Sequence, residues 1–227
     1  MKTKTSTAFT LIEMLVVISI IAVLAAFAVP ALTSALARGQ MTGTMNNARQ
    51  LYLAGQQMAI DGANSSNAAL VWPGDDSAIT TLSIYCTRLV QNDYLKTGDV
   101  AKLLSAPGAI PTVSQDAATP PNITVTGTSG LKVYPVKEAD ASNVIFAASS
   151  NYVYNTAFGA TPSAPFGDKG FVVVRKGGDS AVLRKTNAAA GSGAAAIATF
   201  EATVGKKPGE VQGTVTANDP TGILKSP

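Results

Sequence analysis

Histidine is absent from the 227 residues of the sequence. Because histidine is the usual general base near neutral pH and the commonest metal ligand, its absence removes Ser–His triads and most hydrolytic metal centres. A glycine-rich stretch at residues 191–196 imitates a phosphate-binding loop, but no apolar strand leads into it and too little chain follows for a βαβ unit. The sequence therefore predicts a protein that is not an enzyme and that needs no cofactor.

Cysteine occurs once, so no intrachain disulfide can form. Cys86 lies among Ile79, Leu82, Leu89 and Val90 at helical spacing, which favours a buried structural thiol over a reactive one. Aromatic residues make up 6% of the chain and charged residues 14%, and no basic run alternates with aromatics. Direct binding of nucleic acid is therefore not expected.

A long apolar run near the N-terminus dominates what is present. Residues 14–37 contain no charged side chain, and these 24 residues exceed the ~20 that span a bilayer. Lys2 and Lys4 precede the run, and this positive flank predicts a cytoplasmic N-terminus with the rest of the chain across the membrane. Glu13 is the one charge at the start of the run, and an acid in a membrane helix is costly enough to be a functional candidate.

Residues 8–30, which begin Ala-Phe-Thr-Leu-Ile-Glu, resemble the cleavage and methylation segment of type IV pilins and type II secretion pseudopilins. In that family a short basic leader is removed before Phe, the new amine is methylated, and a glutamate occupies mature position five. The resemblance implies cleavage between Ala8 and Phe9, N-methylation of Phe9, the family glutamate at Glu13 and a helix bend at Pro30. The family's leader normally ends in glycine, so Ala8 predicts slower cleavage.

Cleavage would create a partner for Glu13. The new α-amine of Phe9 lies at the same membrane depth, and an opposite charge within ~4–6 Å favours the ionised acid. The amine of the same chain or of an adjoining subunit would serve. The resemblance implies the neighbour, and Glu13 would then set the stagger of subunits, as buried polar residues do in coiled coils. A protonated Glu13 near the lipid head groups is the alternative.

Two other fates of the N-terminus compete with this interpretation. Residues 35–37, Ala-Leu-Ala, provide a signal-peptidase site before Arg38, which would release a Sec-secreted protein. That fate leaves Glu13 inside an apolar stretch longer than the usual signal core of about 7 to 15 residues. A membrane-anchored binding protein that keeps Met1 and never polymerises is the other alternative.

The resemblance implies a leader at residues 1–8. The spacing of apolar residues predicts an assembly helix at 9–61 that is transmembrane at about 14–37, and a globular head at 62–227. Helical spacing continues past Pro30 to about Ile60, and a helix from Phe9 to Ile60 would be about 78 Å long at 1.5 Å per residue. Since this is about twice what a bilayer needs, the second half must pack outside the membrane.

The head should begin with helices and end with strands. A helix capped by Ser77, a short helical turn capped by Asp99 and an irregular crossing at residues 105–122 come first. Strands with period two follow at residues 123–125, 131–133, 144–146, 152–154, 171–175 and 181–185, with a hairpin at 176–180. Residues 187–198 read as a mobile loop or frayed helix, and 199–204 and 210–217 as edge strands. This order predicts an α+β, pilin-like fold with a long, partly transmembrane N-terminal helix packed on a C-terminal antiparallel sheet.

Loop aspartates are weak candidates for calcium. Asp75, Asp76, Asp168 and Asp179 offer oxygen ligands, but without ordered spacing, and solvated turn aspartates are the simpler interpretation.

The resemblance implies partners and a location. Self-association into a filament, other pilins or pseudopilins, prepilin peptidase and the inner-membrane assembly machinery are the expected partners. The chain would cross the inner membrane once, with its head in the periplasm or in an extracellular filament. Removal of Lys2 and Lys4 with the leader lowers the net charge from +3 to +1, and both a pilus and a pseudopilus remain open.

Overall fold

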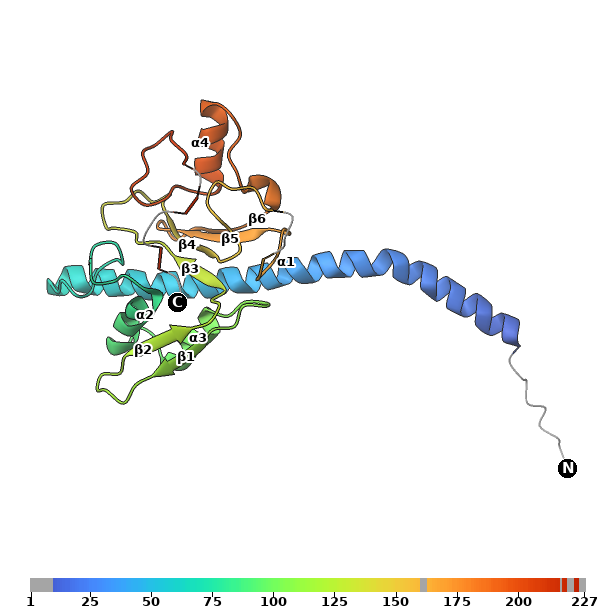
Figure 1. Ribbon diagram of the computed structural model, residues 1–227, viewed down its shortest axis with the longest axis horizontal. Coiled ribbons are helices and arrows are strands. Elements are labelled where there is room, and N and C mark those ends of the chain that lie inside the picture. Colours follow the sequence, from blue (N-terminus) through green and yellow to red (C-terminus); the bar gives the residue numbers. More distant parts are fainter. Residues whose placement is uncertain (1–9, 160–162, 217, 220–222, 225–227) are drawn as a thin grey trace. The chain divides into compact units, whose positions relative to one another are not determined.

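A computed structural model describes residues 10–159, 163–216, 218–219 and 223–224. The chain forms two compact units, Met1–Gly39 and Gln40–Pro227, and helix α1, Leu11–Ser65, supplies residues to both (Figure 1). The unit Gln40–Pro227 is called the head from here on. It includes the second half of α1 as well as the predicted head at residues 62–227.

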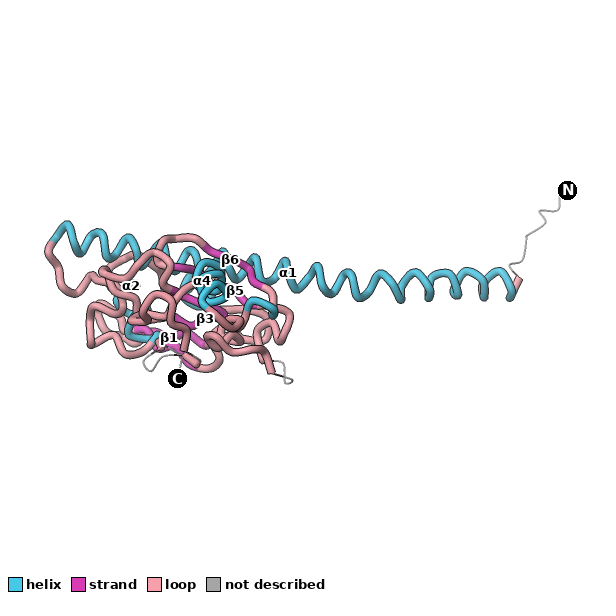
Figure 2. Tube along the Cα trace, turned by 90° about the horizontal axis from the view of Figure 1, so that it is seen from above, coloured by secondary structure: helices cyan, strands magenta, loops and turns pink. Residues whose placement is uncertain are grey.

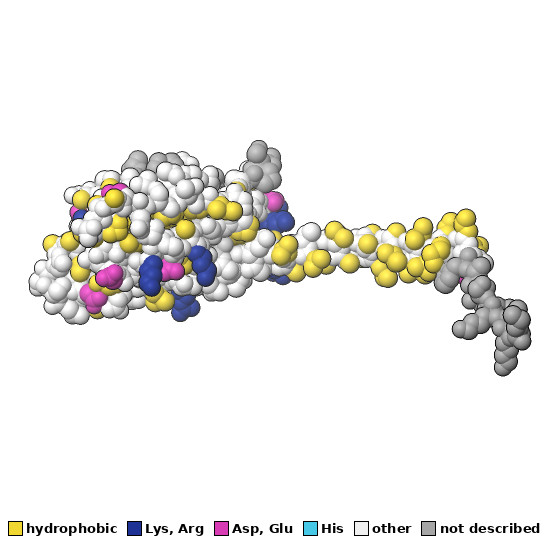
Figure 3. All heavy atoms as spheres, turned by 90° about the horizontal axis from the view of Figure 1, so that it is seen from below, with side chains coloured by type: hydrophobic (Ala, Val, Ile, Leu, Met, Phe, Trp, Pro, Cys, Tyr) yellow, Lys and Arg dark blue, Asp and Glu magenta, His cyan; other side chains and the backbone are white. Residues whose placement is uncertain are grey.

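In the first unit, α1 is apolar on every side. Its residues from Leu11 to Leu36 are exposed all round, and hydrophobic side chains cover this part of the helix on the face shown in Figure 3. Within the described ranges α1 is the one helix long and apolar enough to cross a membrane. A helix that is hydrophobic all round requires apolar surroundings such as lipid or other helices.

The head combines short helices with two antiparallel sheets, and loops make up much of the rest (Figure 2). Its helices after α1 are α2 (Leu82–Gln91), α3 (Thr97–Leu103), the 3-10 helix η1 (Lys185–Asn187) and α4 (Ala194–Thr203). The smaller sheet pairs β1 (Thr112–Gln115) with β2 (Ile123–Thr126). The larger has the order β3 (Leu131–Val133), β4 (Ile145–Ser149), β5 (Phe171–Arg175), β6 (Ser180–Leu183). The predicted α+β, pilin-like fold is confirmed.

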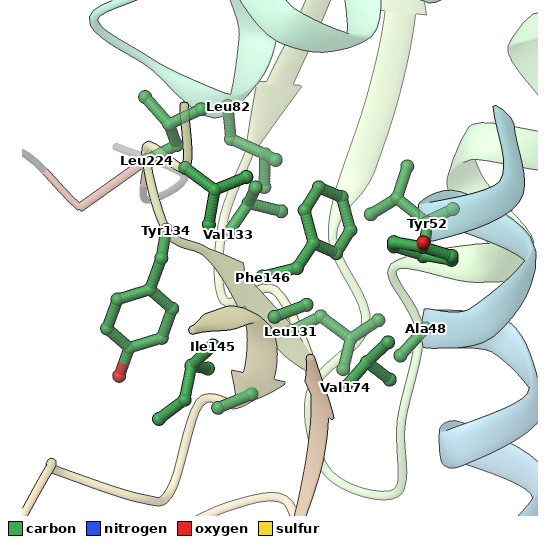
Figure 4. Packing of buried hydrophobic residues seen from close by; sticks show 14 of the residues in the cluster. Ala48, Tyr52, Leu82, Leu131, Val133, Tyr134, Ile145, Phe146, Val174 and Leu224 are labelled. Atoms are coloured by element: carbon green, nitrogen blue, oxygen red, sulfur yellow. The ribbon is translucent and has the colours of Figure 1, made fainter. Parts of the chain in front are cut away.

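The core lies between α1 and the larger sheet. Phe146 of β4 points toward Tyr52 of α1, with ring centroids 5.5 Å apart (Figure 4). The ring of Tyr85 from α2 packs on Phe146 with a centroid distance of 6.4 Å. The preceding residue on β4, Ile145, faces the opposite side of the sheet and lies beside Gly205, which follows the C-terminal end of α4. Helix α1 packs on one face, and the residues that follow α4, Val204 and Gly205, lie against the other, so every residue of β4 and β5 is buried.

Local patterns predicted most elements of the head correctly. The strands β2 to β6 and the hairpin between β5 and β6 are confirmed, and Gly178 adopts the positive φ of 86° that this turn needs. The predicted helix at 77–95 forms as α2, but Thr81, not Ser77, caps it by accepting a hydrogen bond from the Ile84 N–H at 3.3 Å. Asp99 lies in the first turn of α3, not at its cap.

The end of α1 differs from the expected stop near Asp61. The helix continues to Ser65, and Gly62 lies inside it. A Cβ at Gly62 would come within 1.7 Å of the Leu70 carbonyl oxygen. Gly62 is therefore a close-packing glycine rather than a helix terminator.

Four expectations for the loops are wrong. Residues 152–154 alternate between buried and exposed as a strand would, but the Tyr154 N–H bonds the Asp219 carboxylate instead of a neighbouring strand. Residues 112–115 form β1 within the expected irregular crossing, and this strand has no buried face to reveal it. Residues 199–203 are helical in α4, where tertiary packing buries Phe200, and the described residues of 210–217 are irregular with one turn at 212–213.

A tight contact between α1 and α2 provides a test of this packing. We expect Gly55→Ala to destabilise the head by about 1–3 kcal/mol, because the added Cβ would lie 2.1 Å from the Tyr85 hydroxyl. That hydroxyl is buried and has no hydrogen-bond partner in the described structure, so Tyr85→Phe alone should be neutral or stabilising. Thermal unfolding of the full-length protein in mild detergent, followed by the fluorescence of the single tryptophan, measures both.

The double variant Gly55→Ala/Tyr85→Phe should recover most of the loss. Without the hydroxyl, the nearest ring atom, Cζ, lies 3.4 Å from the new Cβ, which is ordinary contact. Additive effects of the two substitutions would contradict this packing.

Candidate functional site

The predicted processing and assembly residues lie at the start of the chain. Ala8 and Phe9 fall outside the described residues, whereas Glu13 and Pro30 lie in α1. Glu13 is the one charged side chain among residues 10–37. The site therefore consists of one carboxylate at the beginning of an exposed apolar helix.

Glu13 belongs to a capping box with Thr10. The Thr10 N–H and the Thr10 hydroxyl both donate to Glu13 Oε2, at 2.8 and 2.7 Å, and the Glu13 N–H donates to Thr10 Oγ1 at 3.3 Å. This reciprocal pattern satisfies backbone donors that the first turn of a helix leaves open. Among the described residues, the second oxygen, Oε1, accepts no hydrogen bond. One side of the carboxylate thus caps its own helix and the other side faces outward.

The sequence analysis missed this capping role. The signal was present, because Thr10-x-x-Glu13 directly precedes a hydrophobic run and has the spacing of a capping box. In the capping box the Glu13 carboxylate accepts two hydrogen bonds at the start of the helix. It is compatible with a second role for Glu13, because only one carboxylate oxygen is engaged.

Pro30 lies inside α1 without ending it. Proline has no N–H, so the carbonyl of Ala26 loses its helical donor at this position. The hydroxyls of Thr33 and Ser34 both donate to the Pro30 carbonyl, at 3.0 Å each. The predicted bend at Pro30 stays a prediction.

The four candidate calcium ligands bond protein groups. Asp75 Oδ2 accepts the Glu138 N–H at 2.8 Å, and Asp76 pairs with Arg88 at 2.8 Å. The pairs Asp168–Lys185 and Asp179–Arg175 lie elsewhere in the head. Within the part of the chain that the structure describes, no group of three or more His, Cys, Asp or Glu residues gathers as a metal site. The expectation that no cofactor is bound stays a prediction.

Several buried polar and ionisable groups of the head have structural partners or an inert environment. Lys132 Nζ lies 2.5 Å from Asp219 Oδ2, and the Tyr134 hydroxyl donates to Asp219 Oδ1 at 2.9 Å. Burial and the Asp219 carboxylate raise the pKa of Tyr134, which keeps its hydroxyl a donor. Cys86 is fully buried, and burial raises its pKa to about 12, so the predicted structural thiol is confirmed. No sequence spacing links Lys132 with Asp219, 87 residues away.

An apolar N-terminal helix with a capped glutamate at its start, followed by an α+β head, is a pilin-like layout. A family model described as "Prokaryotic N-terminal methylation motif" matches residues 3–29. The Type IV major fimbrial protein FimA of Dichelobacter nodosus is 34% identical over 68 residues, which span 30% of this chain and 44% of that protein. No solved structure matches the chain at a significant level. The motif and the fimbrial relative support the type IV pilin family, which confirms the predicted resemblance.

Proposed function

We propose that this chain is a structural subunit of a filament, either a type IV pilus or a type II secretion pseudopilus. The observation that carries the proposal is the coincidence of the methylation motif at residues 3–29 with the all-round apolar part of α1. Such a surface needs lipid while the subunit is stored and other helices once it is assembled. The helix would move between these two apolar surroundings without exposing its side chains to water.

The subunit would be stored in the inner membrane. The pilin-type motif and the single N-terminal apolar helix fit anchoring there, with the head outside the cytoplasm. Lys2 and Lys4 before the apolar run favour a cytoplasmic N-terminus. Prepilin peptidase would then cut between Ala8 and Phe9 on the cytoplasmic side and leave a methylated Phe9.

The chain would act by polymerising, and its partners would carry out any catalysis. The pilin family points to a structural rather than an enzymatic role. Other pilins or pseudopilins would pack around α1, and the assembly machinery would supply the energy. In this arrangement the outward oxygen of Glu13 would pair with the Phe9 amine of a neighbouring subunit and select one stagger.

Mass spectrometry of the mature N-terminus tests the proposal. Protein extracted from its native membrane or filament should begin at methylated Phe9, with residues 1–8 absent. A chain that begins at Arg38 and is freely soluble would identify a Sec-secreted protein. A chain that keeps Met1 would identify an unprocessed membrane anchor. Replacing Ala8 with Gly should leave the cut site unchanged and speed the processing, because glycine is the residue that the family normally carries there.

A further inference from the structure

The head carries a cleft with two carboxylates at its mouth. The last turns of α1 and the loop around Trp72 enclose a cavity of about 310 Å³, whose floor includes Ala59, Gly62 and Ala63. Asp75 and Glu138, both exposed, stand at its edge. We call this cavity, with its two carboxylates, the acidic cleft.

The two carboxylates are held in place by the loops that carry them. The indole N–H of Trp72 donates to Glu138 Oε2 at 2.6 Å, and the Glu138 N–H donates to Asp75 Oδ2 at 2.8 Å. Among the described residues, Glu138 Oε1 and Asp75 Oδ1 accept no hydrogen bond. Each carboxylate is therefore oriented by one oxygen and open to a donor at the other.

A second cavity of about 200 Å³ continues the acidic cleft past Trp72 and is bounded by Lys176. The Lys176 ammonium donates to the backbone carbonyls of Glu138 and Asp140, at 2.5 and 3.0 Å. The Lys176 ammonium therefore bonds backbone carbonyls, and it makes no hydrogen bond to Glu138 Oε1 or Asp75 Oδ1. The acidic cleft thus combines an apolar floor with two open acceptors, which suits a long cationic side chain with a methylene stem.

The opposite end of the head carries exposed cations. Lys169, Arg184 and Lys185 lie beside the pair Gly170–Leu183, and we call these three cations the basic corner. A Cβ at Gly170 would lie 3.3 Å from the side chain of Met41. Met41 lies in the first turn of the α1 segment that belongs to the head, so the basic corner lies beside that turn. Asp168 neutralises Lys185 at 3.0 Å. The side chains of Lys169 and Arg184 make no hydrogen bond to any described residue.

The acidic cleft and the basic corner lie about 33 Å apart along α1, since Met41 and Ala63 are separated by 22 residues at 1.5 Å each. One molecule therefore cannot bring them together. Two different complementary patches on one molecule make a head-to-tail contact, which builds a ring or an open polymer instead of a two-fold dimer, and the proposed filament is the open form.

We propose that Arg184 of one head enters the acidic cleft of the next copy of this chain and that its guanidinium bonds Asp75 and Glu138. This inference rests on the proposed filament function and names one contact within it. The planar guanidinium matches open carboxylate oxygens better than a lysine ammonium does, and the apolar floor covers its stem. The head then contributes a directional contact in addition to the packing of α1.

Site-specific crosslinking of assembled filaments tests the contact. The full-length double variant Ala63→Cys/Arg184→Cys is treated with a short bismaleimide, whose span replaces the arginine side chain. Ala63 lines the acidic cleft and is exposed, and the native Cys86 is buried. A head-to-tail contact predicts a ladder of covalent multimers. Either single variant should give no covalent multimers. The matched pair Ala63→Cys/Lys96→Cys should give none either, because its second site is exposed but lies outside the basic corner.

Charge reversal gives an independent readout. Arg184→Glu should lower the yield of sheared filaments at least about tenfold, because a charged hydrogen-bonded contact is lost and like charges meet, while N-terminal processing stays normal. Lys96→Glu makes the same change in charge and should assemble as the unchanged protein does.

Each other outcome overturns the inference. Filaments that form without a ladder would refute the contact and leave the proposed function standing. A chain that never forms filaments would refute both. If no ladder forms and Arg184→Glu instead weakens retention of the unassembled subunit on vesicles of anionic lipid, the basic corner serves a membrane surface and the docking contact is wrong.

Discussion

Glu13→Gln is expected to abolish filament assembly while the N-terminal helix stays folded and inserted. Glutamine occupies the same position in a capping box as glutamate, so the hydrogen bonds from the Thr10 N–H and hydroxyl persist. The negative charge that would pair with the Phe9 amine of a neighbouring subunit is lost. The measurement is the yield of sheared filaments relative to subunit in the membrane fraction, which should fall to the background level.

Thr10→Ala is the matched control for Glu13→Gln. It removes the hydroxyl that caps the helix but keeps the charge of Glu13, and the lost cap costs about 1 kcal/mol. Assembly should therefore persist, provided that the mature N-terminus is unchanged. Glu13→Ala removes both cap and charge, and it should insert but fail to assemble. Normal filaments from Glu13→Gln would show that Glu13 serves as a cap alone.

Asp219→Ala is expected to destabilise the head by about 3–5 kcal/mol. Asp219 is the carboxylate partner of Lys132, whose side chain is 5% exposed, and it also accepts hydrogen bonds from the Tyr134 hydroxyl and the Tyr154 N–H. Its removal leaves a buried ammonium without this carboxylate and deprives two further donors of their acceptor. Thermal unfolding of the full-length protein in detergent, followed through Trp72, should show a loss of roughly 6 °C or more.

Asp168→Ala provides the comparison for Asp219→Ala. The Asp168–Lys185 pair has the same chemistry at 3.0 Å, but its side chains are 47% and 61% exposed. Solvent screens such a pair, so its loss should cost at most about 1 kcal/mol. Equal losses from the two variants would contradict the role assigned to the buried pair.

Prediction from sequence succeeded where a single segment carries the signal. The strands β2 and β5 are confirmed because each buries apolar residues at successive or alternate positions. The helix α2 is confirmed because Leu82, Cys86 and Leu89 share one face. The predicted resemblance to the N-terminal methylation segment is confirmed by a family model over residues 3–29, because Lys4, Phe9 and Glu13 occur at close spacing within one stretch.

Prediction failed where the decisive partner lies outside the segment itself. The residues around Tyr154 have the alternation of a strand, but the Tyr154 N–H bonds Asp219, 65 residues later. A glycine after Asp61 predicts the end of the helix, but Gly62 remains helical and the Leu70 carbonyl packs against it. Strand β1 lacks a buried face, so only its pairing with β2 reveals it.

The sequence by itself determined the N-terminal half of α1, its apolar surface and the placement of Glu13, because these depend on composition and on spacings of three or four residues. Only the tertiary structure decided the buried Lys132–Asp219 pair, the acidic cleft and the basic corner. Each of these joins side chains from segments tens of residues apart. The physical reason is that burial and ion pairing act between neighbours in space, and the packing of α1 against the sheet chooses those neighbours.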